Sequence, residues 1–202
     1  MFTGLVDGIG TVISIELNNN SARLMVRLPY AVIEAGESIA INGVCLTAVK
    51  TDNYQADFDV SSETLAVTNI EQLTSGDKVN CERAMLANTR VGGHMVTGHV
   101  DNKLTVISLE SCADYVKIFV GNFSNQERLY LINKGCIAID GVSLTINKVL
   151  DTTIELMLVP HTIQNTHFFD LKQGDTVNVE FDYMTRIIAN QVKLILADPG
   201  FM

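Results

Sequence analysis

Clusters of basic residues are missing from this sequence of 202 residues. Asp and Glu outnumber Lys and Arg by 23 to 14, which gives a formal net charge of −9 at pH 7. A surface that binds nucleic acid needs clustered Lys and Arg to neutralise phosphates. Nucleic acid is therefore not an expected partner, whereas small molecules and proteins remain candidates.

Long apolar runs are missing as well. No segment approaches the ~20 consecutive apolar residues that a membrane-spanning helix needs. The opening residues, Met1-Phe2-Thr3-Gly4, lack the charged, apolar and small-residue order of a signal peptide. We therefore expect a soluble, cytoplasmic protein with no membrane partner.

The sequence also lacks a pattern of metal ligands. The four cysteines, at positions 45, 81, 112 and 136, form no C-x-x-C pair and have no histidine at metal-ligand spacing. His94 and His99 stand five residues apart, but no third ligand accompanies them. We expect reduced thiols and no metal site.

What the chain does contain is an internal duplication. Four blocks recur in the same order, and only one spacer between them changes length, by four residues. Such ordered self-similarity is the signature of a repeat architecture. The blocks are Thr3–Asp7, Thr11–Glu16, Ile39–Thr47 and Gly76–Asn80, and their second copies are Thr97–Asp101, Thr105–Glu110, Ile137–Thr145 and Gly174–Asn178.

Each copy has the pattern of a small β-barrel. Apolar and polar residues alternate over residues 11–16, 23–28, 55–60 and 78–83, which is the period of half-buried strands. Asn-Gly at 42–43 and Asp-Gly at 140–141 favour tight I′-type hairpin turns. Many short strands in roughly ninety residues predict a closed or nearly closed barrel, which leaves no exposed edge.

Helices are expected only outside this strand pattern. Short helical stretches are predicted at residues 30–35 and 126–133. In the tail, residues 187–196 carry Ile188, Val192 and Leu196 at helical spacing. About ten residues form a marginal helix alone in water, so this apolar stripe must pack on something. We expect another subunit; packing on its own chain is the alternative.

The two copies differ where a difference has chemical consequences. Cys45 stands opposite Ser143 within a shared Gly-Val-x-Leu-Thr frame, and His99 stands opposite Leu5. A cysteine can act as a nucleophile and a histidine can transfer protons near neutral pH, although a small buried thiol is the plain alternative for Cys45. Matching threonines at 64 and 162, and at 68 and 166, either hydrogen-bond a polar ligand or cap local turns.

Taken together, these residues resemble the riboflavin synthase α-chain family. The resemblance rests on Met1–Val6, Asn42–Thr47, Gly92–His99 and Asp140–Thr145, and it covers essentially the whole chain in order. It implies an all-β fold of two tandem six-stranded Greek-key β-barrels and a C-terminal α-helix. The expected domains are residues 1–93 and 94–186, which would each bind lumazine, and an oligomerisation helix at 187–202.

The resemblance also implies a reaction. Two molecules of 6,7-dimethyl-8-ribityllumazine would be converted by transfer of a four-carbon unit into riboflavin and 5-amino-6-ribitylamino-pyrimidinedione. No cofactor is implied, because the electron-poor pteridine itself stabilises the carbanion at its 7-methyl group. The expected assembly is a homotrimer whose active sites pair the N-terminal barrel of one subunit with the C-terminal barrel of the next. Lumazine synthase is a candidate protein partner.

Site residues are implied by the same resemblance. Cys45 and His99 are expected to carry chemistry in the N-terminal pocket, Ser143, Thr145 and Asp182 to support the second substrate, and Phe2 to pack at the shared site. The N-terminal pocket is expected to comprise Gly4, Leu5, Val6, Cys45, Leu46, Thr47, Asp59, Val60, Ser61, Ser62, Glu63, Thr64, Gly98, His99 and Val100. The C-terminal pocket is expected to comprise Lys134, Ser143, Leu144, Thr145, Val159, Pro160, His161, Thr162, Ile163 and Gln164.

Two of these assignments carry an alternative. His161 stands where the family resemblance leads us to expect a carboxylate, so recognition in the second pocket differs there. Asp182 also reads as an ordinary solvated carboxylate. For the whole protein, the alternative function is a non-catalytic carrier of lumazine or flavin, like the lumazine proteins built on the same duplicated fold. A structural β-module without ligand is disfavoured, because the copies differ at Cys45 and His99 rather than at random surface positions.

Overall fold

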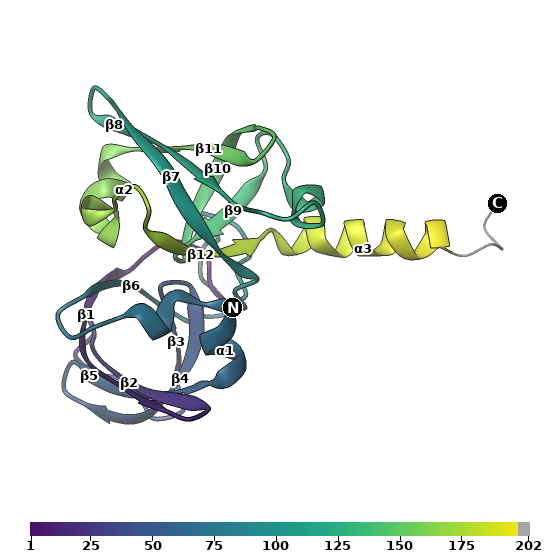
Figure 1. The fold of residues 1–202 in the computed structure, drawn as a ribbon. Coiled ribbons are helices and arrows are strands. Elements are labelled where there is room, and N and C mark those ends of the chain that lie inside the picture. The colour runs from purple at the N-terminus through teal and green to yellow at the C-terminus, as the bar shows by residue number, and fades with distance from the viewer. Residues whose placement is uncertain (198–202) are drawn as a thin grey trace.

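The computed structural model describes residues 1–197 and consists of two closed six-stranded antiparallel barrels followed by a helix (Figure 1). Around each barrel the strands follow the same order, β1-β2-β5-β4-β3-β6 in the first and β7-β8-β11-β10-β9-β12 in the second. The first barrel comprises β1 (Gly8–Asn18), β2 (Ser21–Arg27), β3 (Ser38–Ile41), β4 (Val44–Asp52), β5 (Gln55–Ser61) and β6 (Lys78–Arg83). The second comprises β7 (Asn102–Cys112), β8 (Tyr115–Gly121), β9 (Cys136–Ile139), β10 (Val142–Val149), β11 (Thr153–Leu158) and β12 (Thr176–Phe181).

The predicted strands and turns are confirmed. Along β2, every second side chain is buried and the others face outward, as the alternation predicts. The β3–β4 turn has φ of 45° at Asn42 and 78° at Gly43, and the β9–β10 turn repeats this with 42° at Asp140 and 79° at Gly141. Positive φ at both central residues defines the I′ turn, which suits the twist of the strands that it joins.

Each barrel encloses its own apolar core. Leu24, Phe58 and Val79 are fully buried in the first, and Leu104 and Phe181 are almost fully buried in the second. Burial of such side chains at about 25 cal/mol per Å² supplies the main stabilisation of these small domains. A third, smaller cluster joins the barrels and contains Phe2, Ala40, Val96 and Ala138.

Hydrogen bonds that repeat in both halves link the two barrels. The Asn80 side chain donates to the carbonyl of Asp140 (3.0 Å), and the Asn178 side chain donates to the carbonyl of Asn42 (2.9 Å). The two hairpin turns also lie back to back, so that a Cβ on Gly43 would be 2.6 Å from the backbone nitrogen of Gly141. The barrels are therefore related by an approximate two-fold arrangement with the turns at its centre.

The short helices differ from the prediction. Residues 30–35 form no helix, and Tyr30 is held by a hydrogen bond to Asp7 (2.8 Å). Within 126–133 only Glu127–Tyr130 is helical, as the 3₁₀ helix η2. The structure adds α1 (Ser62–Val67), η1 (Asn69–Gln72), α2 (Pro160–Asn165) and η3 (His167–Asp170), which follow β5 and β11.

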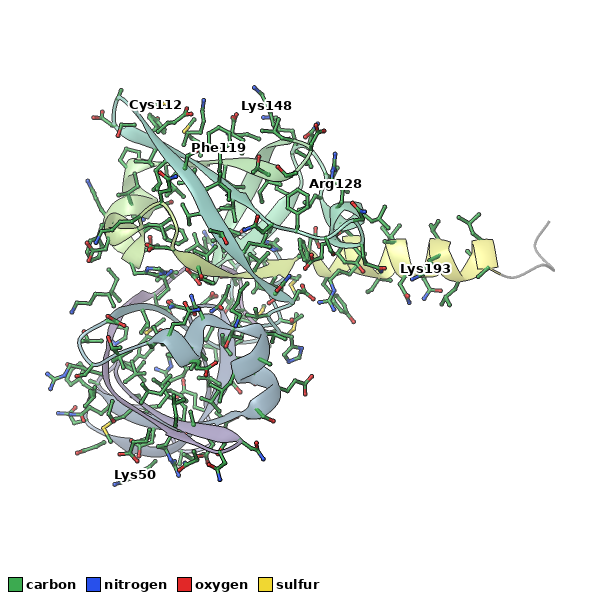
Figure 2. The ribbon with its side chains drawn as sticks, in the orientation of Figure 1. Lys50, Cys112, Phe119, Arg128, Lys148 and Lys193 are labelled. Carbon is green, nitrogen blue, oxygen red and sulfur yellow. The ribbon has the colours of Figure 1, made fainter. Side chains whose placement is uncertain are left out.

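The C-terminal helix α3 covers Tyr183–Ala197, so it begins four residues before the predicted start at 187. The Asp182 side chain accepts a hydrogen bond from the backbone nitrogen of Met184 (2.9 Å) and caps the helix there. The last part of the predicted segment, 198–202, lies outside the described residues. Figure 2 shows α3, marked by Lys193, extending away from both barrels. Among the helices of residues 1–197, none has the length and apolar character needed to cross a membrane.

Candidate functional site

A pocket opens at one end of the first barrel, beside Cys45. Its volume is about 260 Å³. Three segments form it: the start of β4, helix α1, and the stretch 98–100 that leads into the second barrel. The residues lining it are Val44, Cys45, Glu63, Thr64, Val67, Thr68, Gly98, His99 and Val100. The structure thus brings Cys45 and His99 to one pocket, together with the predicted residues Glu63 and Thr64.

Helix α1 places Glu63 and Thr64 at this pocket through local hydrogen bonds. The Ser61 hydroxyl caps the helix by accepting a hydrogen bond from the backbone nitrogen of Thr64 (3.2 Å). At the other end, the Thr68 hydroxyl donates to the carbonyl of Thr64 (2.7 Å). Thr166 makes the same bond to Thr162 in α2 (2.7 Å). Thr68 and Thr166 therefore cap local turns, as one of the two interpretations predicts, and Thr68 also lines the pocket.

The backbone at 98–100 is held directly against Cys45. The Cys45 backbone nitrogen donates to the carbonyl of Gly98 (2.8 Å), and Val100 packs on the core of the first barrel. Gly98 has φ of +80°, and an added Cβ would lie 2.5 Å from the Cβ of Cys45. Only glycine fits this close approach without strain.

In the second barrel, the N-terminal stretch of the chain makes the equivalent contact with Ser143. The Ser143 backbone nitrogen donates to the carbonyl of Gly4 (2.8 Å), and Val6 packs on the core of the second barrel. Gly4–Val6 therefore belongs with the C-terminal pocket, and its predicted place in the N-terminal pocket is wrong. The reason is that residues 2–6 leave their own barrel and cross to the other, which the repeat alignment does not reveal.

The second barrel differs from the first pocket at four corresponding positions. It has Ser143 for Cys45, Leu5 for His99, His161 for Glu63 and Asn165 for Val67. The Asn165 side chain donates to the carbonyl of His161 (2.7 Å) and lies 3.3 Å from its Nδ1 atom, which holds the imidazole at the exposed start of α2. The first pocket thus combines a thiol, an imidazole and a carboxylate, and the corresponding positions of the second barrel combine a hydroxyl, an apolar side chain and an imidazole.

Ser143 has a histidine partner that Cys45 lacks in the other barrel. The His94 Nδ1 atom lies 2.7 Å from the Ser143 hydroxyl. Burial lowers the pKa of His94 below its ordinary value, although the nearby charges of Asp182 and Glu180 act in the opposite direction. A neutral imidazole can accept the hydroxyl proton, so this pair is suited to proton transfer near neutral pH.

The remaining predicted residues support the pockets in different ways. Leu46, Val60 and Leu144 are buried in the barrel walls, and Phe2 is fully buried in the cluster between the barrels. A Cβ on Gly98 would meet the Phe2 ring at 2.8 Å, so Phe2 lies behind the pocket segment.

Several predicted residues are exposed to solvent. Thr47, Thr145, Lys134, Ser62, Gln164 and Val159 are exposed. Asp59 pairs with Arg23 (3.2 Å) on the outside of the first barrel. Ile163 packs on the core of the second barrel, and Pro160 begins α2, where proline is well tolerated. Asp182, besides capping α3, lies near enough to His94 to influence its charge.

A pair of buried carboxylates was not predicted from the sequence. Glu82 in β6 and Glu180 in β12 are 7% and 4% exposed, and they occupy corresponding positions in the repeat. Each accepts hydrogen bonds from one of the two segments that cross to the opposite barrel, residues 2–6 and 97–100, which we call the crossing segments. Glu82 accepts from Thr3, and Glu180 accepts from Thr97. Their signal was present, because a glutamate recurs two residues after the repeated Gly-Asp-x-Val-Asn block.

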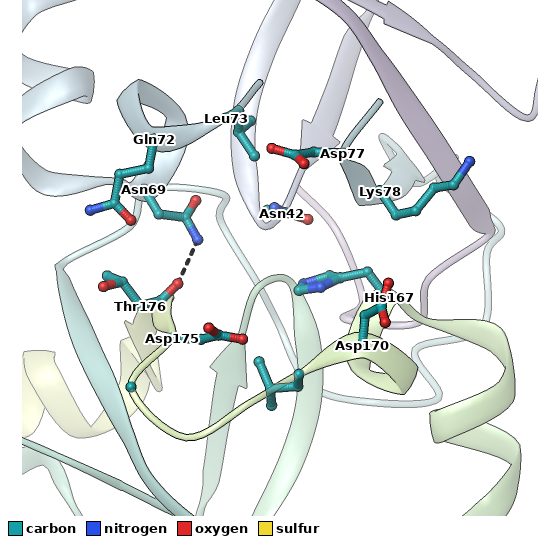
Figure 3. Close-up of a pocket in the computed structure, with 12 residues that line it drawn as sticks. Asn42, Asn69, Gln72, Leu73, Asp77, Lys78, His167, Asp170, Asp175 and Thr176 are labelled. Atoms are coloured by element: carbon teal, nitrogen blue, oxygen red, sulfur yellow. Dashed lines mark hydrogen bonds between the residues drawn. The ribbon is translucent and has the colours of Figure 1, made fainter. Parts of the chain in front are cut away.

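A second cavity of about 410 Å³ lies where the barrels meet, away from these residues (Figure 3). Its polar groups bind one another: the Asn69 side chain donates to the carbonyl of Thr176 (3.0 Å), and His167 Nε2 lies 3.1 Å from Asp140. The first of these bonds joins η1 of the first half to β12 of the second barrel, and the second lies within the second half, so we assign both a structural role. Within residues 1–197, no group of three or more His, Cys, Asp and Glu side chains is arranged to hold a metal ion.

Comparisons with known proteins define the class. A lumazine binding domain model matches twice, over residues 3–84 and 97–182, which include the strands of both barrels. The chain is a duplicated lumazine-binding-domain protein. Two solved structures of LumP share this fold: the complex with 6,7-dimethyl-8-(1'-D-ribityl) lumazine has a TM-score of 0.80 at 27% identity, covering 89% of this chain and 98% of LumP. The complex with riboflavin has a TM-score of 0.83 at 26% identity, covering 90% and 99%.

Within this class, riboflavin synthases are among the curated relatives that match the chain. Riboflavin synthase of Photobacterium phosphoreum is 39% identical, covering 98% of this chain and 90% of the relative. Riboflavin synthase of Bacillus subtilis is 37% identical over the full length of both, and that of Escherichia coli is 35% identical over 98% and 94%. The chain belongs to the riboflavin synthase family.

Proposed function

We propose that this protein converts two molecules of 6,7-dimethyl-8-ribityllumazine into riboflavin and 5-amino-6-ribitylamino-pyrimidinedione. A four-carbon unit passes from one lumazine to the other. The two products together contain all the atoms of the two substrates, so no oxidant or further reactant is required. The observation that carries the proposal is the duplication itself: the residues of the Cys45 pocket have chemically different counterparts in the other barrel, in a chain that matches riboflavin synthases along its whole length.

Two pockets suit a reaction between two copies of one molecule. Holding both reactants in a fixed orientation replaces an encounter in solution, and such positioning contributes up to about 7–11 kcal/mol in favourable cases. We assign one lumazine to each barrel, with the domains at residues 1–93 and 94–186. The unequal residues then give the two substrates different roles.

The proposed chemistry divides between the pockets. In the first, Cys45 adds to the ring or positions an attacking water, and His99 transfers a proton. In the second, Ser143 contacts the other lumazine, and His94 takes up or returns the proton of its hydroxyl (2.7 Å). Thr145 and Asp182 support that second substrate. General acid–base groups of this kind contribute about 10²–10⁴-fold in rate.

The C-terminal helix supports a proposal for the assembly. Ile188, Val192 and Leu196 are 58%, 49% and 79% exposed, and with Leu129 and Ile132 they line an apolar groove of about 710 Å³. Exposed apolar stripes of this kind mark protein interfaces. We propose that α3 assembles a homotrimer in which the N-terminal pocket of one subunit faces the C-terminal pocket of its neighbour.

The small size of the first pocket agrees with shared active sites. At about 260 Å³ it falls just below the ~300–1,000 Å³ that small-molecule sites usually have. A neighbouring subunit would supply the remaining wall. The four free cysteines are consistent with a cytoplasmic location. The candidate partner lumazine synthase stays a prediction, which co-sedimentation of the two proteins would test.

The alternative function is a lumazine or flavin carrier. The similarity to LumP in complex with lumazine and with riboflavin favours it. Against it, the identities are 35–39% with riboflavin synthases and 26–27% with LumP. One assay separates the two: pure protein is incubated with 6,7-dimethyl-8-ribityllumazine, without metal or nicotinamide, and riboflavin is followed by absorbance and fluorescence. Riboflavin formation supports the enzyme, whereas binding without riboflavin supports the carrier.

A further inference from the structure

Two buried glutamates make the same set of hydrogen bonds in the two halves of the molecule. Glu82 Oε1 accepts from the backbone nitrogen and the hydroxyl of Thr3 (2.6 and 2.8 Å), and its Oε2 accepts from the backbone nitrogen of Gly4 (3.1 Å). Glu180 accepts the corresponding three bonds from Thr97 (2.7 and 2.8 Å) and Gly98 (2.8 Å). Each carboxylate thus receives three hydrogen bonds from only two consecutive residues.

Such bonds are strong enough to fix a backbone segment. Hydrogen bonds to a charged acceptor are roughly twice as strong as neutral ones. A buried carboxylate also needs these donors, because without them its charge is costly to keep out of water. Burial raises the pKa of Glu82, and the donors from Thr3 and Gly4 act in the opposite direction. The glutamate and the segment therefore hold each other in place.

Each glutamate stands in one barrel, but the segment that it binds contacts the other barrel. Glu82 stands in β6 of the first barrel, yet Gly4 continues into a hydrogen bond with Ser143 of the second barrel (2.8 Å). Glu180 stands in β12 of the second barrel, yet Gly98 continues into a hydrogen bond with Cys45 of the first (2.8 Å). Each glutamate is thus two hydrogen bonds away from the pocket of the opposite barrel.

We propose that Glu82 and Glu180 are positioning residues that act crosswise: Glu180 sets the backbone that completes the Cys45 pocket, and Glu82 sets the backbone that completes the Ser143 pocket. The assignment of these pockets to two lumazine molecules rests on the proposed function. The crosswise positioning itself is a property of the fold. It would make the shape of each pocket depend on the last strand of the other barrel.

The test compares Glu82→Gln with Glu180→Gln in the full chain. The amide keeps the size of the side chain but turns one acceptor oxygen into an NH₂ group, which cannot accept a hydrogen bond. Two reporters sit at the ends of the crossing segments: the backbone amides of Cys45 and Ser143, whose hydrogen exchange is measured by NMR without ligand. Riboflavin formation is measured on the same samples.

Glu180→Gln should speed exchange of the Cys45 amide about tenfold and leave that of Ser143 within twofold, and Glu82→Gln should do the reverse. Glu155→Gln is the matched control, because Glu155 is a buried carboxylate whose ion pair is with Lys148 (3.9 Å). It should change neither amide. If a glutamine variant fails to fold, Thr97→Val and Thr3→Val remove one donor each and should give smaller shifts in the same direction.

The outcomes are separable. Equal effects of both variants on both amides, or no effect on either, overturn the crosswise positioning. A general loss of stability does not reproduce the pattern, since it would affect the two reporters alike. If the exchange pattern is crosswise but the unsubstituted protein forms no riboflavin, the proposed function fails and the positioning stands. If the protein is active, each variant should also lower its turnover.

Discussion

Gly98→Ala tests whether the close approach of residues 98–100 to Cys45 forms the first pocket. Two costs follow from the structure. Gly98 has φ of +80°, and the left-handed region costs a residue with a Cβ about 1–2 kcal/mol. The new methyl group would also lie 2.5 Å from Cys45 Cβ and 2.8 Å from the Phe2 ring. Phe2 is fully buried, so it has no room to turn away.

The segment must therefore move away from Cys45. That movement breaks the hydrogen bond from the Cys45 nitrogen to the Gly98 carbonyl, worth about 1 kcal/mol. Residual overlap in a packed region costs about 1–3 kcal/mol more. We expect Gly98→Ala to lower the free energy of unfolding by about 3–6 kcal/mol in all, and to abolish most of the riboflavin synthesis.

Gly76→Ala is the matched control. Gly76 has φ of +99°, but an added Cβ there would meet nothing within 4 Å. It should therefore lose only the backbone contribution of about 1–2 kcal/mol and keep its activity. The free energies of unfolding are measured by urea denaturation and the rates by riboflavin fluorescence. Equal destabilisation by the two substitutions, or an active Gly98→Ala protein, would refute the reasoning.

Three further predictions concern the chemistry and the assembly. Cys45→Ser should slow riboflavin formation at least about 100-fold with little change in lumazine binding, and full activity would remove Cys45 from the mechanism. Because burial lowers the pKa of His94 below its ordinary 6.5, turnover should stay level as the pH falls to 6.5 and decline only below it. His94→Gln should remove that decline; a decline that persists assigns it to another group. The free energy of unfolding should also fall below pH 6.5, because the unfolded chain binds the His94 proton more readily there than the folded chain does. Truncation after Met184, or Ile188→Asp within α3, should yield monomers by analytical ultracentrifugation, whereas Asn190→Asp on another face of the helix should not; a surviving trimer in the first two variants contradicts the interface.

The pattern of the sequence predicted the strands better than the helices. The alternation at 23–28 and 78–83 corresponds to β2 (Ser21–Arg27) and β6 (Lys78–Arg83), because side chains two apart in a strand share a face. Helix α1 was missed, because six residues are too few for a helical period to show. Its capping residue Ser61 was noted only as part of the pocket.

For the site, the comparison of the two copies identified the unequal residues but not their surroundings. Cys45 and His99 share one pocket, as predicted. The pairing of His94 with Ser143 was not predicted, since 49 residues separate them and no counterpart in the first copy points to it. The placement of Gly4–Val6 was predicted wrongly for the same reason, because the repeat alignment treats each copy as self-contained.

By itself, the sequence determined the duplication, the barrel strands, the I′ turns and two of the positions at which the copies diverge, Cys45 and His99. These features depend on residues that are neighbours along the chain or on direct comparison of the copies. Only the tertiary structure decided that each crossing segment completes the pocket of the other barrel and that Glu82 and Glu180 hold those segments. The physical reason is that the bonds donated by Thr3 to Glu82 and by Thr97 to Glu180 span 79 and 83 residues. Contacts of that kind form when the barrels close and pack together, and they leave no periodic trace in the sequence.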